Sequence, residues 1–271
     1  QRARDEGVRV WADQYPYATS GSDGNTVLIP DWALLDPNGR RGRPPAEALR
    51  GHLADPASEA AILRDIEHEI RRRGGADRVV VFDYPDRELI GRNLQEIADA
   101  RGIDPVRMAI ALQLEGDAHQ PGGGRLRGFS LSEIDVRAYA AQPWVATASD
   151  GGIALPVDGP VHPRFYGTFP RKIREYALDT GVISLEHAIR SQTSLPARIM
   201  GLDDRGEIRE GYWADLVVFD LESLRDTSTF FEPHQYAEGI EHVFVNGEPV
   251  VENGHILYAL PGRVIPSRKG R

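Results

Sequence analysis

The chain has 271 residues, of which 41% are hydrophobic and 27% are charged, so its composition supports a packed core and excludes bulk disorder. A net charge of −9 and a pI of about 5.4 argue against a nucleic-acid partner, because a phosphate-binding surface needs clustered basic charge. The absence of cysteine excludes disulfides and a thiolate nucleophile, and it fits a reducing cytosol. No apolar stretch is long enough to span a bilayer, so we expect a cytoplasmic protein without a membrane partner.

The first residues have the character of a helix end. Residues 1–7 resemble the last turns of a helix that leads into a strand at Val8–Ala12. Because no helix start signal precedes them, we expect further sequence upstream.

The first two-thirds of the chain alternates short apolar runs with helical patterns. Continuous, β-branched-rich runs predict buried strands at Val8–Ala12, Val79–Phe82 and Trp144–Ala148. Such alternation predicts a parallel sheet, either open or part of a (β/α)8 barrel, with too few strands here to close a barrel alone. Helices are predicted at Pro56–Arg73, at Leu94–Arg101 before Gly102, at Val106–Leu114 after Asp104-Pro105, and from a Ser130 cap to Ala141 with Glu133 at the capping-box position.

The pattern changes after about residue 200. Strands are predicted at Glu207–Gly211, Ala214–Asp220 and His242–Val251, and the pair Asn246-Gly247 is a strong hairpin signal. We therefore expect an α/β body over residues 1–200 and a small antiparallel β unit over residues 201–271.

Several motifs resemble one family. G-E-I-R-E-G-Y-W-A-D-L-V-V-F-D (206–220) and H-V-F-V-N-G-E-P-V-V-E-N-G (242–254) resemble the C-terminal part of the composite β-domain of the amidohydrolase superfamily. The N-acyl-D-amino-acid deacylase (D-aminoacylase) branch has similar segments in the same order. They are D-Q-Y-P-Y (13–17), I-P-D-W (29–32), G-F-S-L-S-E-I-D-V (128–136), Q-P-W-V-A-T-A-S-D-G (142–151) and H-P-R-F-Y-G-T-F-P-R (162–171).

The resemblance spans nearly the whole chain and implies the C-terminal half of such an enzyme. Residues 1–200 would be the C-terminal strands and helices of a (β/α)8 TIM barrel. Residues 201–271 would be the C-terminal part of the composite β-sandwich.

Asp150 is the candidate catalytic residue. It follows the apolar run Trp144–Ala148, at the strand end where barrel enzymes place catalytic groups. The resemblance implies that it takes a proton from a metal-bound water and returns it to the leaving amine, and Asp150 is also a candidate metal ligand. The residues alone leave another interpretation open, a turn-forming aspartate before Gly151-Gly152.

The implied substrate carries a free α-carboxylate, for which a guanidinium is the natural bidentate partner. The resemblance assigns this role to Arg164 and makes Tyr15 a hydroxyl donor to the same carboxylate. The branch also uses a serine shortly after Y-P-Y, which here is either Ser20 or Ser22. Arg164 as a surface ion pair and Tyr15 as a core aromatic remain alternatives. His162 either orients its loop or touches substrate.

The sequence departs from the family pattern at the metal ligands. Members carry an H-x-H, a bridging Cys or Glu and two further histidines, whereas the eight histidines here have no H-x-H or H-E-x-x-H spacing. The resemblance therefore implies one or two zinc ions held mostly by residues absent from this chain, on a complementary N-terminal chain or fragment.

We expect hydrolysis of N-acyl-D-amino acids, or of related N-acyl amino acids, together with that N-terminal half; a higher oligomer is left open. A cyclic amidase of the hydantoinase or dihydroorotase kind is one alternative, which a substrate panel would distinguish. The other alternative is a non-catalytic half that acts in binding or assembly. A second chain with H-x-H in the same operon would argue against it.

Overall fold

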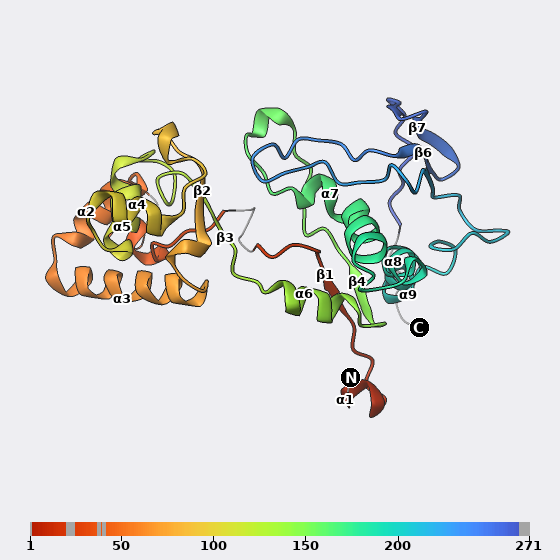
Figure 1. The fold of residues 1–271 in the computed structure, drawn as a ribbon, viewed down its shortest axis with the longest axis horizontal. Helices are drawn as coiled ribbons and strands as arrows, with labels where there is room; N and C mark the ends of the chain where they lie inside the picture. The colour runs from red at the N-terminus through yellow and green to blue at the C-terminus, as the bar shows by residue number, and fades with distance from the viewer. Residues whose placement is uncertain (1, 20–24, 37–38, 40–41, 266–271) are drawn as a thin grey trace. The chain divides into compact units, whose positions relative to one another are not determined.

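The computed structural model describes residues 2–19, 25–36, 39 and 42–265 (Figure 1). The chain forms two compact units. Unit 1 comprises Gln1–Tyr17 and Glu133–Arg271, and unit 2 comprises Ala18–Ser132. Unit 2 is therefore an insertion in the sequence of unit 1.

Unit 1 contains two short parallel strands from distant parts of the chain. Strand β1 (Ala12–Gln14) pairs with β4 (Val145–Thr147), with Ala12 opposite Val145. The predicted strand Trp144–Ala148 contains β4, but the predicted strand Val8–Ala12 is wrong, because pairing starts only at Ala12. Val8 and Val10 have no strand partner and are exposed.

Helices precede and follow β4 in the chain. After the short α1 (Arg2–Asp5), unit 1 contains α6 (Glu133–Ala140), α7 (Arg164–Arg171), a π-helical segment (Lys172–Asp179), α8 (Leu185–Gln192) and α9 (Ser194–Met200). Because α6 begins at Glu133, Ser130 is not its cap, contrary to the prediction. The main hydrophobic cluster of this unit is formed by Val136, Ala140, Ile173, Tyr176, Ile183, Ala188 and Leu224.

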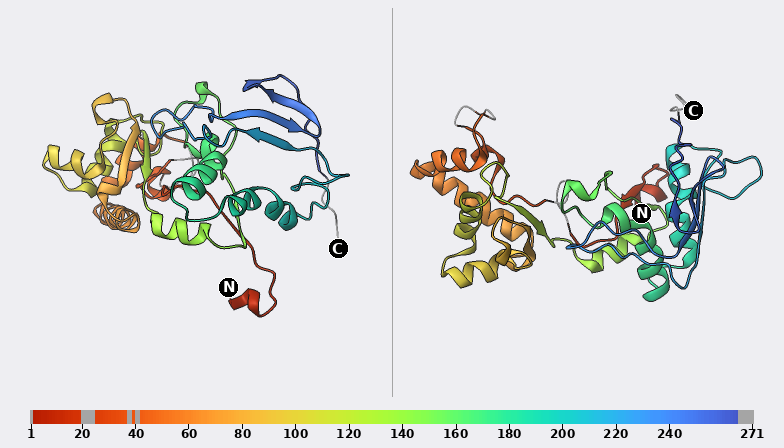
Figure 2. Two further views of the ribbon diagram at one scale, coloured as in Figure 1. Left: turned by 45° about the vertical axis from the view of Figure 1, so that its right-hand side comes forward. Right: turned by 90° about the horizontal axis from the view of Figure 1, so that it is seen from above.

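The C-terminal region of unit 1 is a four-stranded antiparallel sheet (Figure 2). Its strands are β5 (Leu216–Phe219), β6 (Ile240–Val245), β7 (Glu248–Glu252) and β8 (His255–Ile256). Asn246 and Gly247 both have positive φ, 53° and 86°, as a tight hairpin turn requires, which confirms that signal. The strand predicted at Glu207–Gly211 is wrong, since the segment has no strand partner and Ile208 is 92% exposed.

The described residues of unit 2 form four main helices and one antiparallel strand pair. The helices are α2 (Pro45–Leu53), α3 (Pro56–Arg72), α4 (Leu94–Arg101) and α5 (Pro105–Glu115), with short 3-10 turns at Asp31–Leu34, Ala76–Arg78 and Arg87–Leu89. The predictions for α3, α4 and α5 are confirmed, because each start carries a local cap. The Asp55 carboxylate accepts from Ser58 N at 2.9 Å, Asn93 and Glu96 form a capping box, and Asp104 accepts from Val106 N.

The strand pair of unit 2 corrects the expectation of a parallel sheet. Strand β2 (Val79–Asp83) forms where predicted, but it runs antiparallel to β3 (Arg125–Gly128), a strand that the sequence did not indicate. The only parallel pair among the described strands is β1 with β4. The fold is thus mixed α/β without a closed barrel, and the division at residue 200 stays a prediction.

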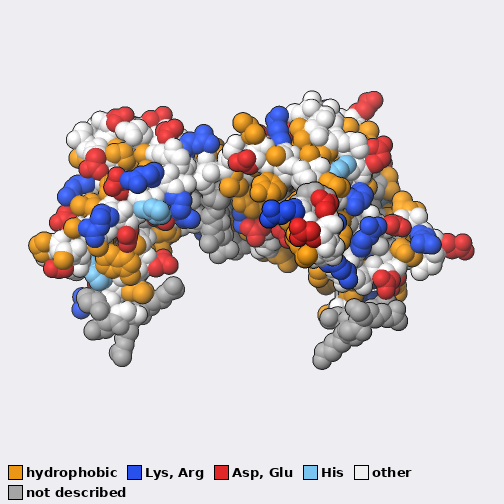
Figure 3. Space-filling view, turned by 90° about the horizontal axis from the view of Figure 1, so that it is seen from below, with side chains coloured by type: hydrophobic (Ala, Val, Ile, Leu, Met, Phe, Trp, Pro, Cys, Tyr) orange, Lys and Arg blue, Asp and Glu red, His pale blue; other side chains and the backbone are white. Residues whose placement is uncertain are grey.

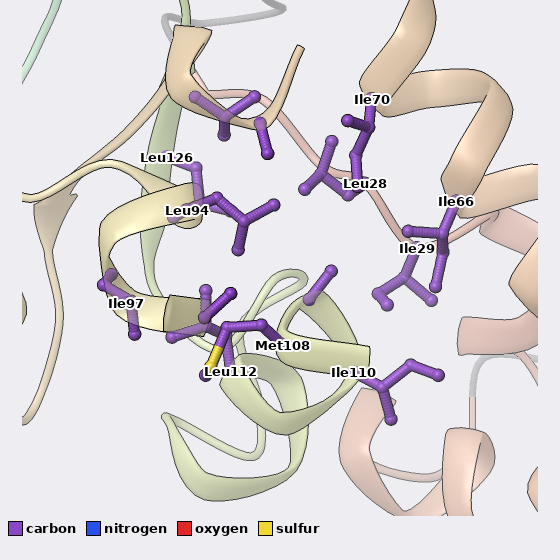
Figure 4. Close-up of a cluster of buried hydrophobic side chains, with 14 of the residues drawn as sticks. Leu28, Ile29, Ile66, Ile70, Leu94, Ile97, Met108, Ile110, Leu112 and Leu126 are labelled. Carbon is purple, nitrogen blue, oxygen red and sulfur yellow. The ribbon is translucent and has the colours of Figure 1, made fainter. Parts of the chain in front are cut away.

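The core of unit 2 is apolar and its helices are amphipathic. Figure 4 shows the side chains that meet there, among them Ile66 and Ile70 from α3, Leu94 from α4, and Met108 and Leu112 from α5. The basic run lies at the C-terminal end of α3, where Arg71 pairs with Glu67 while Arg72 and Arg73 pair with Glu69. Acidic and basic side chains are interspersed on the face shown in Figure 3. None of the described helices is both long and apolar enough to cross a membrane.

Candidate active site

Asp150 lies in the loop that leaves β4. Its φ of 47° falls in the left-handed region, which aspartate tolerates better than most residues. A Cβ on the next residue, Gly151, would lie 3.1 Å from the Cα of Phe165, so glycine permits the close approach of this loop to α7. The Asp150 side chain is 66% exposed, which leaves its carboxylate accessible to a substrate or a water molecule.

Arg164, the first residue of α7, holds Asp150 through two contacts. Its Nε donates to the backbone carbonyl of Asp150 at 2.9 Å, and its Nη2 lies 3.0 Å from Oδ2 of the carboxylate. Nη1 is buried and has no hydrogen-bond partner among the described residues. The alternative of an ion pair is thus realised, but with an arginine whose side chain is only 4% exposed rather than one at the surface.

Tyr15, directly after β1, lies beside this pair. The Cζ of Arg164 is 4.9 Å from the centroid of the Tyr15 ring, a cation–π distance. Burial raises the pKa of Tyr15, the charge of Arg164 opposes this, and the charge of Asp150 adds to it. The hydroxyl therefore stays protonated and able to donate. Ser20 and Ser22 lie outside the described residues.

His162 is buried next to Tyr17 and the first residue of α7. Its Nδ1 accepts a hydrogen bond from the backbone N–H of Arg164 at 3.0 Å, so this nitrogen carries no proton. Its ring contacts Tyr17 and Phe230 edge-on, with centroids 5.1 and 5.2 Å apart. Of its two predicted uses, these contacts support the orientation of the loop.

Three further residues belong to this region, and their roles were not predicted from the sequence. The hydroxyl of Tyr17 donates to Oδ2 of Asp226 at 2.9 Å across 209 residues of sequence. Arg171 donates from Nε to the carbonyl of Pro16 at 2.8 Å, and its guanidinium lies over the Tyr17 ring. The motif 162–171 ends on Arg171 and could have indicated it, but no sequence signal connects Asp226 to Tyr17.

The described residues do not form a zinc site by themselves. Among them, no three histidine, aspartate or glutamate side chains lie close enough together to hold a metal ion. The histidines are dispersed, with His68 in α3, His187 in α8 and His242 in β6. Asp150 is the single candidate ligand that the exposed part of this site offers, so the group of residues present does not fit zinc without further ligands.

Comparison with known proteins identifies the same family as the motifs. A sequence model described as "Amidohydrolase family" matches residues 48–251. D-aminoacylase of Alcaligenes xylosoxydans xylosoxydans is 38% identical over 187 residues, which cover 69% of this chain and 36% of that protein. N-acyl-D-glutamate deacylase of the same organism is 32% identical over 264 residues, which cover 97% of this chain and 43% of that protein. The chain thus spans less than half the length of these curated relatives.

Solved structures of two relatives each match 95% of this chain. A structure of D-aminoacylase, from work on its binuclear metal centre, matches with a TM-score of 0.62 at 31% identity, over 95% of this chain and 43% of that one. N-acyl-D-glutamate deacylase from Bordetella bronchiseptica, complexed with zinc and a phosphonate mimic of the tetrahedral intermediate, matches with a TM-score of 0.61 at 28% identity, over 95% and 44%. These matches confirm the resemblance that the motifs predicted, and the chain belongs to the amidohydrolase family.

Proposed function

We propose that this chain carries the acid/base and the carboxylate-binding groups of a zinc-dependent enzyme that hydrolyses the amide bond of N-acyl-D-amino acids. The observation that supports this most is the grouping of Asp150, Arg164 and Tyr15 where the chain leaves two adjacent parallel strands. An acid/base next to an arginine and a hydroxyl is what such a substrate requires, because the carboxylate lies one carbon from the amide nitrogen.

Asp150 acts as the proton carrier. As a water oxygen attacks the acyl carbonyl carbon, the Asp150 carboxylate takes one proton from that water. The same proton then goes to the amide nitrogen while the C–N bond breaks, which yields a carboxylic acid and a free amino acid. Because the Asp150 carboxylate is exposed, it can reach both the water oxygen and the amide nitrogen of the substrate, and the ion pair with Arg164 fixes its position.

Arg164 and Tyr15 bind the α-carboxylate of the substrate. Nη1 of Arg164 is buried and has no partner among the described residues, so a carboxylate oxygen that enters beside it would accept from its two N–H groups without breaking the pair with Asp150. The Tyr15 hydroxyl, close to the same guanidinium, is the second donor. Ser20 or Ser22 is the proposed third donor to this carboxylate.

We assign β1 and β4 to adjacent positions in a (β/α)8 barrel, with unit 2 inserted between them. Residues 1–200 apart from that insertion belong to the barrel in this proposal, and residues 201–271 form the C-terminal part of a composite β-sandwich. The remaining strands and the zinc ligands come from polypeptide outside these 271 residues. In support, the chain covers 43% of the length of the D-aminoacylase structure with a binuclear metal centre, and the described residues contain no metal-ligand cluster.

A substrate panel tests this function. The chain is combined with a complementary chain that carries H-x-H and the further histidines, loaded with zinc, and assayed on N-acetyl-D-amino acids, their L-enantiomers, hydantoins and dihydroorotate. Hydrolysis of the N-acetyl-D-amino acids, lost in Asp150→Ala, is the expected result. Turnover of the cyclic amides instead would assign a cyclic amidase. No turnover by a folded, zinc-loaded assembly would favour a role in binding or assembly.

A further inference from the structure

Asp226 lies in the connection between β5 and β6, and its carboxylate packs against α7. Oδ2 accepts from the hydroxyl of Tyr17, and Oδ1 accepts from the backbone N–H of Ser228, both at 2.9 Å. A Cβ on Gly167 would overlap this carboxylate, so glycine is what allows the carboxylate to rest directly on the helix backbone.

Both partners of Asp226 belong to segments that carry site residues. Tyr17 is two residues after Tyr15, and Gly167 is three residues after Arg164, on the first turns of α7. Asp226 therefore connects the segment that carries the hydroxyl donor to the helix that carries the guanidinium, and it comes from outside both.

Two other contacts join the same segments. Arg171 holds Pro16 and the Tyr17 ring from the far end of α7, while the ring of His162 packs on Tyr17 and accepts from Arg164 N–H. Burial raises the pKa of Asp226 above its ordinary value, and the bonds from Tyr17 and Ser228 and the charge of Arg171 offset this only in part. The contact between Tyr17 and Asp226 rests on its geometry, a hydroxyl that donates to Oδ2 at 2.9 Å.

We infer that Asp226 is a positioning residue, which sets the placement of Tyr15 relative to Arg164 and thereby the binding of the substrate carboxylate. Its role in substrate binding rests on the function proposed above, whereas its effect on Tyr15 does not. The connection between β5 and β6 thus tunes the carboxylate site without touching the reacting atoms.

The structural effect is measured by 19F NMR of the full chain, in whichever assembly is soluble, labelled with 3-fluorotyrosine. The chain has nine tyrosines, and the signal of Tyr15 is assigned by its loss in Tyr15→Phe. Asp226→Ala removes both acceptors and should shift the Tyr15 signal. Asp220→Ala is the matched control, because Asp220 begins the same connection but its carboxylate accepts from its own turn, from Glu222 N and from Ser223, and this variant should leave the Tyr15 signal in place.

Two further variants keep the test decisive if Asp226→Ala does not fold. Tyr17→Phe removes only the hydroxyl from the other side of the same bond, and Gly167→Ala adds a methyl group that displaces the carboxylate. Both should shift the Tyr15 signal in a folded protein. A Tyr15 signal that stays unmoved in the folded variants would overturn the inference.

The consequence for substrate binding is read from kinetics of the zinc-loaded assembly. Asp226→Ala should raise KM for the free acid about tenfold and change kcat by less than about twofold, while KM for the methyl ester of the same substrate stays unchanged. Equal increases for acid and ester would assign Asp226 a general structural role instead. An inactive wild-type assembly would count against the proposed function, and the NMR result would still decide whether Asp226 positions Tyr15.

Discussion

The guanidinium of Arg164 contacts Asp150 twice, through Nε to the backbone carbonyl at 2.9 Å and through Nη2 to the carboxylate at 3.0 Å. The backbone contact fixes where the loop stands, and the side-chain contact fixes where the carboxylate points. Two residues that the sequence motifs assign to separate tasks are therefore mechanically coupled. A substitution of either one is expected to disturb the other.

Asp150→Asn should nearly abolish hydrolysis in the zinc-loaded assembly. Asparagine can keep the contact with Arg164 through its amide oxygen, but it cannot take up a proton, and loss of a general acid/base lowers the rate by about 10²–10⁴. Steady-state kinetics with circular dichroism measure activity and folding on the same sample. A folded variant that retains more than a tenth of the wild-type rate would exclude the acid/base role.

Arg164→Met should impair substrates with a free carboxylate more than their esters. Loss of a charge-assisted hydrogen bond lowers kcat/KM for the acid by roughly ten- to a hundredfold. Because Arg164 also holds Asp150, we expect a smaller loss on the ester, visible in kcat. The ratio of kcat/KM between acid and ester is the quantity to measure. An unchanged ratio would indicate that Arg164 acts only on Asp150.

Lys172→Met should stabilise the folded protein at neutral pH. Lys172 is buried, has no carboxylate partner among the described residues and lies over the Tyr176 ring, and burial lowers its pKa from 10.5 to about 8. Below pH 8 the folded state must bear this buried charge, so its penalty is fully present there and is relieved as the pH rises from about 8 to 10.5. The shift corresponds to about 3 kcal/mol in the free energy of unfolding.

Urea unfolding between pH 7 and pH 10 checks this linkage. The wild type should gain stability over the upper part of the range, and Lys172→Met should show a higher free energy of unfolding at pH 7 and a flatter pH dependence. Arg190→Met serves as the control, because Arg190 bonds the carbonyl of Pro143 from an exposed position. Parallel pH profiles of Lys172→Met and the wild type would contradict the shifted pKa.

Zinc binding should depend on a complementary chain. The described residues contain no metal-ligand cluster, and no residue of the strands β5–β8 is fully buried, which leaves Val217, Val218 and Ile256 exposed. An antiparallel sheet needs one covered face, so co-expression with the H-x-H chain should improve solubility and bring in zinc together. Metal analysis after gel filtration measures this. Stoichiometric zinc in the 271-residue chain by itself would sink the proposal.

Local signals in the sequence determined the elements that depend on neighbours along the chain. Asp55, Asn93 and Asp104 cap α3, α4 and α5 where predicted, because a cap needs only the next turn of the same helix. The Asn246-Gly247 hairpin forms for the same reason, since positive φ at both residues is a local preference. The motifs around Asp150 and Arg164 identified the family.

Only the tertiary structure decided which distant segments meet. The apolar run Val79–Phe82 predicts a buried strand. Its hydrophobicity is the same whether its partner runs parallel or antiparallel, so the antiparallel pairing with β3 could not be predicted from the sequence. The pairing of Ala12 with Val145 across all of unit 2 and the bond from Tyr17 to Asp226 are of the same kind. Such contacts depend on the closure of long loops and on the packing of whole elements, for which the sequence carries no periodicity or spacing.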